Sequence, residues 1–287
     1  MDQRLIDLHH DYVHHHFDRR RFLEEAATLA GGITAAAALL PLLDSDYARA
    51  ETIKESDPRI VTERITFTGA TGAVKGYLAK PKGDGRHPGV VVIHEIGGVN
   101  PHIEDIARRL GTEGYVALAV DFLSPLGGTP IDGKGAAQIA MKLNPAQTAA
   151  NGVAAVKYLR SRPDVNGKVG EVGFCWGGRV AQAVAVEDPT LDAAVVFYGE
   201  PPNPSEAPKL RAPLLMNFAD PKLDVRNGEE VLVYENALKA AGKDYELHFY
   251  PGAQHGFNND ANAPRYNEAA AKEAWGRTLD WFRKYLG

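Results

Sequence analysis

The sequence predicts an α/β fold in which helices cover both faces of a mostly parallel sheet. Three observations support this prediction. Between residues 89 and 250, short runs of apolar and β-branched residues recur, and each has the length of a buried parallel strand. Segments with apolar residues at helical spacing separate these runs. Residues 60–67 and 74–79 flank a glycine-containing turn, which predicts a hairpin ahead of the parallel strands.

The elements after the hairpin are expected to alternate along the chain. The expected strands are residues 89–94, 115–120, 168–172, 191–199, 213–218 and 245–250. The expected helices are residues 102–113, 146–161, 177–186, 228–241 and 264–286. Prolines and glycines predict loops over residues 122–144 and 201–208.

Length and composition indicate one globular domain, which we expect over residues 51–287, preceded by a leader. The net charge of −5, with no basic block beyond residues 19–21, argues against a nucleic-acid partner. The single cysteine, Cys175, excludes an internal disulfide and a multi-cysteine metal site. Residues 51–287 are nearly neutral, which suits a neutral or weakly charged small molecule better than a polyanion.

Residues 1–50 have the layout of an export signal. Arginines at 19–21 precede a mildly apolar stretch over residues 26–43, and an Ala-x-Ala sequence ends at Ala50. The paired arginines resemble the twin-arginine form of signal. We therefore expect export to the periplasm with cleavage after Ala50 and no membrane span in the mature form. The alternative is an N-terminal helix that packs on the body of a cytoplasmic protein.

Residues 173–178, Gly-Phe-Cys-Trp-Gly-Gly, predict a nucleophile elbow. A strand-like segment precedes them and a small-residue helix follows, so Cys175 stands at a sharp turn between strand and helix. Side chains two positions before and after the nucleophile would collide with the strand and the helix, which explains Gly173 and Gly177. The alternative interpretation is a buried cysteine beside an ordinary glycine turn.

The chain order of the reactive residues matches the α/β-hydrolase triad, in which the nucleophile is followed by an acid and then a histidine. His255 follows the last expected strand, and it would take the thiol proton and later activate water. An acid would hold the imidazole in the correct tautomer. Both Asp220 and Asp224 follow the strand before it, and we favour Asp224 because Pro221 gives Asp220 the context of a turn.

Residues 94–98, His-Glu-Ile-Gly-Gly, end a strand and predict an oxyanion loop. The backbone N–H groups of Ile96 and Trp176 would stabilise the negative charge of a tetrahedral intermediate. Glu95 would then lie close to Cys175, where a carboxylate disfavours a thiolate unless it accepts the thiol proton itself.

Three segments, residues 94–98, 173–178 and 252–257, are similar to the dienelactone hydrolase (carboxymethylenebutenolidase) family. The similarity extends over residues 60–286, and the leader together with residues 223–227 resembles a subgroup with an N-terminal extension. This resemblance implies the α/β-hydrolase fold and hydrolysis of an enol lactone, without a metal or an organic cofactor.

The resemblance also implies a role for each matching residue. Cys175 corresponds to the nucleophile, His255 to the base and Asp224 to the residue that orients the base. Ile96 and Trp176 correspond to the oxyanion donors. The residue matching Glu95 contacts the cysteine and helps to form the thiolate when substrate binds.

The sequence departs from the family at two places that hold a substrate carboxylate. Well-studied members place arginines after the strand matching residues 116–120 and a few residues past the catalytic histidine. Residues 122–125 and 257–260 contain no arginine here. The sequence therefore predicts a hydrolase of a small-molecule ester or lactone without naming the substrate. The alternative is a non-catalytic member of the fold that binds a small molecule and buries an unreactive thiol.

Overall fold

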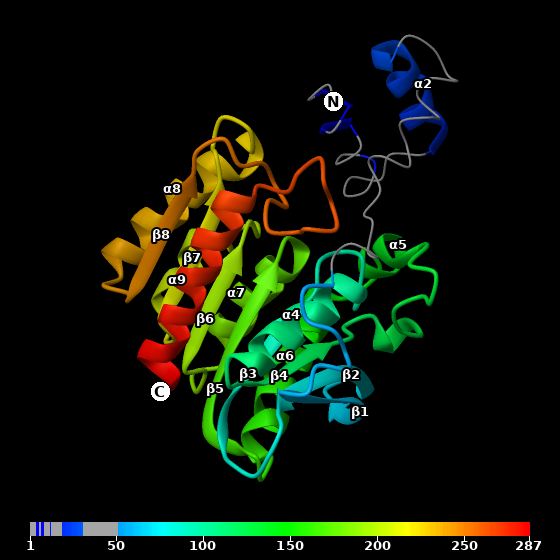
Figure 1. Cartoon of the computed structure of the whole chain (residues 1–287). Coiled ribbons are helices and arrows are strands. Elements are labelled where there is room, and N and C mark those ends of the chain that lie inside the picture. Colours follow the sequence, from blue (N-terminus) through cyan, green and yellow to red (C-terminus); the bar gives the residue numbers. More distant parts are fainter. Residues whose placement is uncertain (1–3, 6, 9–11, 13–18, 31–50) are drawn as a thin grey trace.

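The computed structural model describes residues 4, 5, 7, 8, 12, 19–30 and 51–287 of the chain (Figure 1). Its centre is an eight-stranded sheet in the order β1-β2-β4-β3-β5-β6-β7-β8. Strands β4, β3, β5, β6, β7 and β8 run parallel to one another, whereas β2 pairs antiparallel with β4 and β1 pairs antiparallel with β2 at one edge. This architecture confirms the predicted mostly parallel α/β fold.

The strands are β1 (Ile60–Gly69), β2 (Gly72–Pro81), β3 (His87–Ile93), β4 (Val116–Val120), β5 (Val165–Phe174), β6 (Ala193–Phe197), β7 (Leu214–Ala219) and β8 (Tyr245–Tyr250). The α-helices are α2 (Arg19–Ala30), α4 (Pro101–Thr112), α5 (Ala136–Ala140), α6 (Pro145–Ser161), α7 (Trp176–Glu187), α8 (Val225–Ala240) and α9 (Glu268–Leu286). Two 3₁₀ helices are η1 (Ser124–Leu126) and η2 (Pro204–Lys209).

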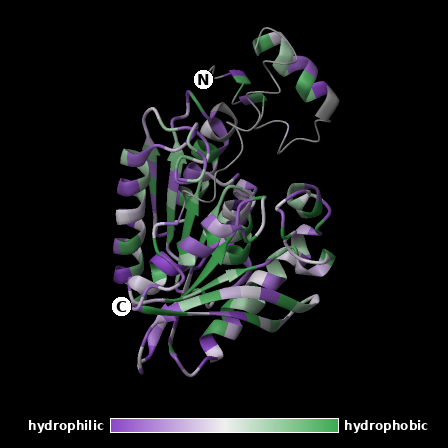
Figure 2. Ribbon diagram, turned by 45° about the vertical axis from the view of Figure 1, so that its right-hand side comes forward, coloured by the Kyte–Doolittle hydropathy of each residue, from purple (hydrophilic) through white to green (hydrophobic). Residues whose placement is uncertain are grey.

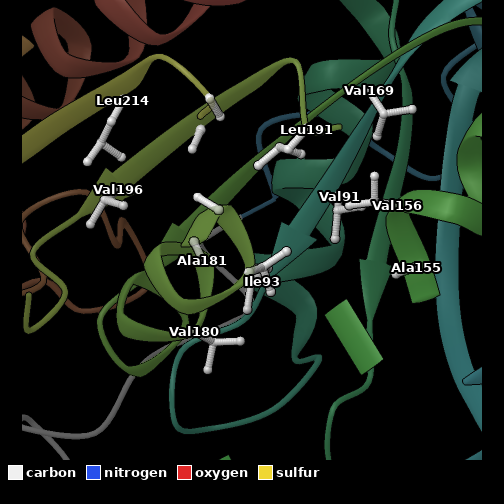
Figure 3. Close-up of a cluster of buried hydrophobic side chains, with 14 of the residues drawn as sticks. Val91, Ile93, Ala155, Val156, Val169, Val180, Ala181, Leu191, Val196 and Leu214 are labelled. Atoms are coloured by element: carbon white, nitrogen blue, oxygen red, sulfur yellow. The ribbon is translucent and has the colours of Figure 1, made fainter. Parts of the chain in front are cut away.

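Two hydrophobic cores lie on opposite faces of the sheet. On one face, α6, α7 and α8 pack against β3, β6 and β7, and Figure 3 shows residues of this core, such as Val91, Val156 and Val180. On the other face, α4 and α9 contribute Ile103, Phe282 and their neighbours. The central strands are largely apolar, while the edge strands and the helices carry polar residues as well (Figure 2). Burial of the strands on both faces explains their continuous apolar runs.

Helix α5 was not predicted from the sequence. It is only five residues long and lies inside residues 122–144, for which we expected a loop. Its buried alanines, Ala136 and Ala140, pack against Ile96 and Leu123. Helix α9 begins at Glu268 rather than at residue 264, because the Asn267 side chain accepts a hydrogen bond from the backbone N–H of Ala270 and caps the helix there.

The described part of the leader contains α2 and a small separate apolar cluster of Leu5, Leu8, Phe22 and Ala26. Most of the expected apolar stretch and the expected cleavage site after Ala50 lie outside the described residues. Among the residues that are described, no helix has both the length and the apolar character needed to span a membrane.

Strand β5 carries a fully buried acid, Glu171, which predicts an unusual pH dependence of stability. Neither carboxyl oxygen has a hydrogen-bond partner in the described structure. Burial, with a smaller contribution from the charge of Asp188, raises the pKa of Glu171 well above its usual value. The folded protein therefore keeps a proton that the unfolded chain releases above about pH 4.5. Stability is lost as the pH rises from that value toward the folded-state pKa.

Glu171→Gln is expected to remove this loss, because a neutral amide has no proton to release. The difference in unfolding free energy between the variant and the wild type should grow by about 1.4 kcal/mol per pH unit within that window. Urea unfolding between pH 5 and 8 measures it, with the exposed Glu230→Gln as control. Parallel pH profiles for wild type and Glu171→Gln would contradict the burial of an acid at this position.

Candidate active site

Cys175 lies at the turn between β5 and α7, in the strained conformation that an elbow requires. Its φ of 53° and ψ of −119° are rare for a residue with a side chain. A Cβ at Gly173 would lie 2.1 Å from the carbonyl oxygen of Gly177, and one at Gly177 would lie 2.3 Å from that of His94. Both glycines are therefore required by close backbone approach, as the sequence predicted. The turn places the sulfur at the N-terminus of α7, where the helix dipole favours negative charge.

The structure brings Cys175, His255 and Asp224 together from three separate loops. His255 Nε2 lies 3.1 Å from Cys175 Sγ, and its Nδ1 lies 3.0 Å from Asp224 Oδ2. The Cys175 residue is 8% exposed and the His255 side chain 17% exposed. One imidazole thus bridges a thiol and a carboxylate in a largely water-excluded position.

Asp220, the other candidate acid, has a different position. Its Oδ1 accepts a hydrogen bond from the backbone N–H of Lys222, and its Oδ2 accepts one from Gly252. These backbone donors lower the pKa of Asp220. Asp220 therefore joins the turn after β7 to the loop after β8, as Pro221 suggested, and Asp224 is the acid beside His255.

The electrostatics of the bridge favour a protonated imidazole at His255. Burial alone would lower the pKa of His255, but the negative charge of an ionised Cys175 and the hydrogen bond to Asp224 outweigh burial and raise this pKa to about 10. The geometry therefore favours an imidazolium at His255 beside the Cys175 sulfur at neutral pH.

This electrostatic arrangement predicts a measurable titration. In the wild type, the His255 imidazole should stay protonated up to about pH 10. In Cys175→Ala the neighbouring negative charge is lost while burial remains, so the midpoint should fall by about one pH unit or more. Nitrogen-15 NMR of the histidine ring in both proteins measures the two midpoints. Equal midpoints would show that the thiol is not the source of the shift.

Glu95 is held by two neutral donors. Its Oε1 accepts a hydrogen bond from the Tyr198 hydroxyl at 3.4 Å, and its Oε2 accepts one from Asn259 Nδ2 at 2.7 Å. Burial, followed by the negative charges of Glu95 and Cys175, raises the pKa of Tyr198 well above its usual value. Tyr198 therefore keeps its proton and remains a donor to Glu95.

The expected oxyanion loop follows β3 and is fixed by His94. The Nδ1–H of this buried imidazole donates to the carbonyl oxygen of Glu95 at 2.6 Å, and Nε2 accepts from the backbone N–H of Phe122 at 3.2 Å. Burial lowers the pKa of His94, which agrees with a neutral ring. The ring stacks on Trp176 at a centroid distance of 5.2 Å. Ile96 is buried beside Trp176 and α5.

Arg265 is a charged residue that the sequence did not single out. Burial lowers its pKa, while the negative charges of Cys175, Glu95, Asp7 and Asp224 raise it, so the guanidinium is within electrostatic reach of three site residues and of Asp7 in the leader. A Cβ at Gly256 would lie 3.6 Å from Arg265 Cδ, so the arginine stem passes over the residue after His255. Arg265 stands ten residues after His255, a spacing that carries no recognisable signal.

A small cavity of about 170 Å³ lies next to Trp176, between α7 and the segment that joins α5 to α6. Its lining includes Leu143, Ala149 and Val180 and is largely apolar. A larger cavity of about 670 Å³ lies between the β1–β2 hairpin and residues 129–133, and none of the candidate site residues lines it.

Within the described residues, no group of three or more His, Cys, Asp or Glu side chains could hold a metal ion.

Similarity to known proteins extends over most of the chain. A sequence profile of the dienelactone hydrolase family matches residues 74–286. A protein of Salmonella typhi, provisionally named a carboxymethylenebutenolidase, is 37% identical over 226 residues, which cover 74% of this chain and 83% of that protein. A protein of Escherichia coli K12 with the same provisional name is 34% identical over 252 residues, which cover 82% and 91% of the two chains.

A solved structure shows that the similarity includes the fold. The crystal structure of a provisionally assigned dienelactone hydrolase from Klebsiella pneumoniae superposes with a TM-score of 0.70 at 32% identity, and the match covers 79% of this chain and 99% of that one. Since the profile spans most of the chain and the relatives match it at more than 30% identity, this chain belongs to the dienelactone hydrolase family and is a hydrolase of the α/β-hydrolase fold.

Proposed function

We propose that the protein hydrolyses small esters or lactones through a Cys175–His255–Asp224 triad and a thioester acyl-enzyme. The observation that supports this most directly is the imidazole of His255, which lies 3.1 Å from the Cys175 sulfur and 3.0 Å from an Asp224 oxygen. A nucleophile, a base and an orienting acid within hydrogen-bond reach are the requirements of covalent acyl transfer.

The acylation half begins with the Cys175 proton on His255. The thiolate attacks the carbonyl carbon of the substrate, and the carbonyl π electrons move to oxygen. We assign the resulting oxyanion to the backbone N–H groups of Ile96 and Trp176. Trp176 is the first residue of α7, so its N–H has no partner within the helix. Collapse of the intermediate expels the alcohol or enol oxygen, which takes the proton from His255 and leaves a thioester on Cys175.

Deacylation repeats these roles with water. His255 removes a proton from water as the oxygen attacks the thioester carbonyl, and the same two N–H groups would stabilise the second oxyanion. Collapse breaks the carbon–sulfur bond, releases the carboxylic acid and restores the thiolate–imidazolium pair. Asp224 supports the positive charge on His255 in both halves.

We infer that the substrate is a small ester or lactone. Enol lactones that bear a carboxylate, the compounds to which the names of the relatives refer, are included in this class. The name carboxymethylenebutenolidase, carried by the Salmonella and Escherichia proteins, denotes an enol lactone that bears a carboxylate. Residues 122–125 and 257–260 contain no arginine. Arg265 places a positive charge within electrostatic reach of Cys175, and it also faces the negative charges of Glu95, Asp7 and Asp224.

The test is hydrolysis of a chromogenic short-chain ester and of a carboxylate-bearing enol lactone, with mass spectrometry of the protein during turnover. We expect an acyl adduct on Cys175 and loss of hydrolysis after stoichiometric alkylation with iodoacetamide. Full activity of the alkylated protein would refute the mechanism. A thiol that reacts slowly, together with no hydrolysis of either substrate, would favour a non-catalytic binding protein.

A further inference from the structure

The cavity of about 170 Å³ begins at Trp176, the residue that follows the nucleophile. Four of its lining residues lie on α7 at positions i, i+3, i+4 and i+7, and they are Trp176, Arg179, Val180 and Ala183. Residues at this spacing share one face of a helix. The cavity therefore extends along one face of α7, starting from the elbow that carries Cys175.

The opposite wall of the cavity is built from α5, α6 and the residues that join these helices. Ala140 ends α5, Pro145 begins α6, and Ala149 follows one turn later. Both alanines are 2% exposed. The Thr148 hydroxyl donates to the carbonyl oxygen of Asn144 at 2.9 Å, so it needs no partner from a ligand. This wall can therefore accept an apolar group without leaving a polar atom unpaired.

The cavity offers no unpaired charge to a ligand. Of the described residues that line it, Arg179 alone carries a charge. Its guanidinium pairs with Glu200 at 3.2 Å, and both side chains are more than half exposed to solvent. Because this charge is already paired and solvated, the lining favours an apolar group over a charged one.

The volume of the cavity limits the size of that group. Complete small-molecule sites measure about 300–1,000 Å³, so a cavity of about 170 Å³ holds a part of a substrate and not the whole molecule. An apolar cavity of about 150 Å³ is large enough for benzene. The cavity beside Trp176 therefore has room for about six carbon atoms.

The order of the strands indicates which half of an ester faces the cavity. Strand β5, which leads to Cys175, lies between β3 and β6 in the sheet. His255 follows β8, so it approaches the sulfur from the β6 side. Helix α5 packs on Ile96, which follows β3, so the cavity lies on the other side. Because His255 must give its proton to the leaving oxygen, the alcohol faces His255 and the acyl group faces the cavity.

We propose that this cavity is the acyl-group subsite of the enzyme, and that it selects esters whose acyl part carries an apolar chain or ring of about four to six carbon atoms. The inference deepens the proposed function and rests on it, because it names the substrate class of the same nucleophile. Leu143 and Ala183 set the size of the subsite, since they line it from opposite walls. Both are only partly buried, so a change of side chain there spares the core.

The test is the kcat/KM of para-nitrophenyl esters from acetate to decanoate. Each buried methylene should raise kcat/KM about fourfold until the chain reaches about hexanoate, and longer chains should gain nothing further. Ala183→Leu fills the cavity, so we expect the hexanoate-to-acetate ratio to fall about tenfold. Leu143→Ala enlarges the cavity, so the preferred chain should lengthen to octanoate or beyond. Ala240→Leu, the same substitution at an exposed residue of α8, should keep the wild-type ratio.

Opposite shifts of the preferred chain length separate a subsite from damage to the fold. A distorted α7 would displace Cys175 and lower the rate for every ester by a similar factor. In aryl acetates that carry alkyl chains on the ring, Ala183→Leu should leave the dependence on chain length unchanged. The inference is overturned if wild-type kcat/KM does not rise with the acyl chain, or if Ala183→Leu lowers the acetate and hexanoate rates equally. It is also overturned if the variants respond to the length of the alcohol instead.

A reaction that needs no hydrolysis distinguishes this inference from the proposed function. Alkyl methanethiosulfonates react with the Cys175 thiolate, which forms a disulfide to the alkylthio group while methanesulfinate leaves. The rate of the pentyl reagent relative to the methyl reagent should fall about tenfold in Ala183→Leu. That response without hydrolysis of any ester would refute the proposed function and leave the subsite supported. Hydrolysis of esters with no dependence on chain length in either reaction would do the reverse.

Discussion

Cys175→Ala is expected to lower kcat/KM for ester hydrolysis by about 10⁴-fold or more. The substitution removes the sulfur that would carry the acyl group in the proposed mechanism, and the sequence contains no second cysteine. The fold should survive, because the methyl group of alanine fits wherever the thiol does and Cys175 donates to Phe197 and accepts from Gly178 through its backbone. Initial rates on a chromogenic ester measure the loss, and thermal unfolding checks the fold.

The control for this prediction compares the single variants Cys175→Ala and His255→Asn with the double variant, because residues that act as one unit have non-additive effects on the rate. His255→Asn should cost a similar factor, because a thiol without its base is mostly protonated, and the double variant should be no slower than Cys175→Ala alone. Independent, multiplicative effects would mean that the two residues do not act as one unit. A Cys175→Ala protein with near wild-type rates would show that hydrolysis proceeds without the thiol.

The triad could be predicted from the sequence because each of its parts leaves a local signal. The elbow needs glycines at positions 173 and 177 for steric reasons, so their spacing around the cysteine is informative. Asp224 and His255 follow β7 and β8, which are parallel neighbours, so their loops lie at one edge of the sheet. The choice between Asp220 and Asp224 depended on a turn signal, Pro221, that is also local.

The surroundings of Cys175 could not be predicted in the same way, because they depend on tertiary geometry. Tyr198 follows a buried strand, where a tyrosine is ordinary core, and Asn259 stands in a polar loop. Arg265 reaches the site only through the path of residues 256–264. Helix α5 is so short, and so closely flanked by glycines and prolines, that its period is not visible in the sequence. It forms because its alanines pack on Ile96 and Leu123.

Gly177→Ala is the second substitution with a large expected effect, and it acts on the fold beneath the site. The added Cβ would lie 2.3 Å from the carbonyl oxygen of His94 and 2.4 Å from that of Ile93. These atoms end β3, a central strand that pairs with β4 and β5 on its two sides, so they cannot give way. Helix α7 must move instead. We expect a loss of about 3 kcal/mol or more in unfolding free energy.

Movement of α7 would also displace Cys175 from His255, so activity should fall even at temperatures where the Gly177→Ala protein remains folded. Gly276→Ala is the matched control, because Gly276 lies within α9 and an added Cβ there would meet no atom within 4 Å. Alanine has the higher helix propensity, so this control should be stabilised by about 0.5–1 kcal/mol. Urea unfolding of the three proteins measures both effects. Equal stability of Gly177→Ala and wild type would mean that β3 and α7 are not in contact at the elbow. The position of Cys175 relative to His255, which depends on that contact, would then be wrong as well.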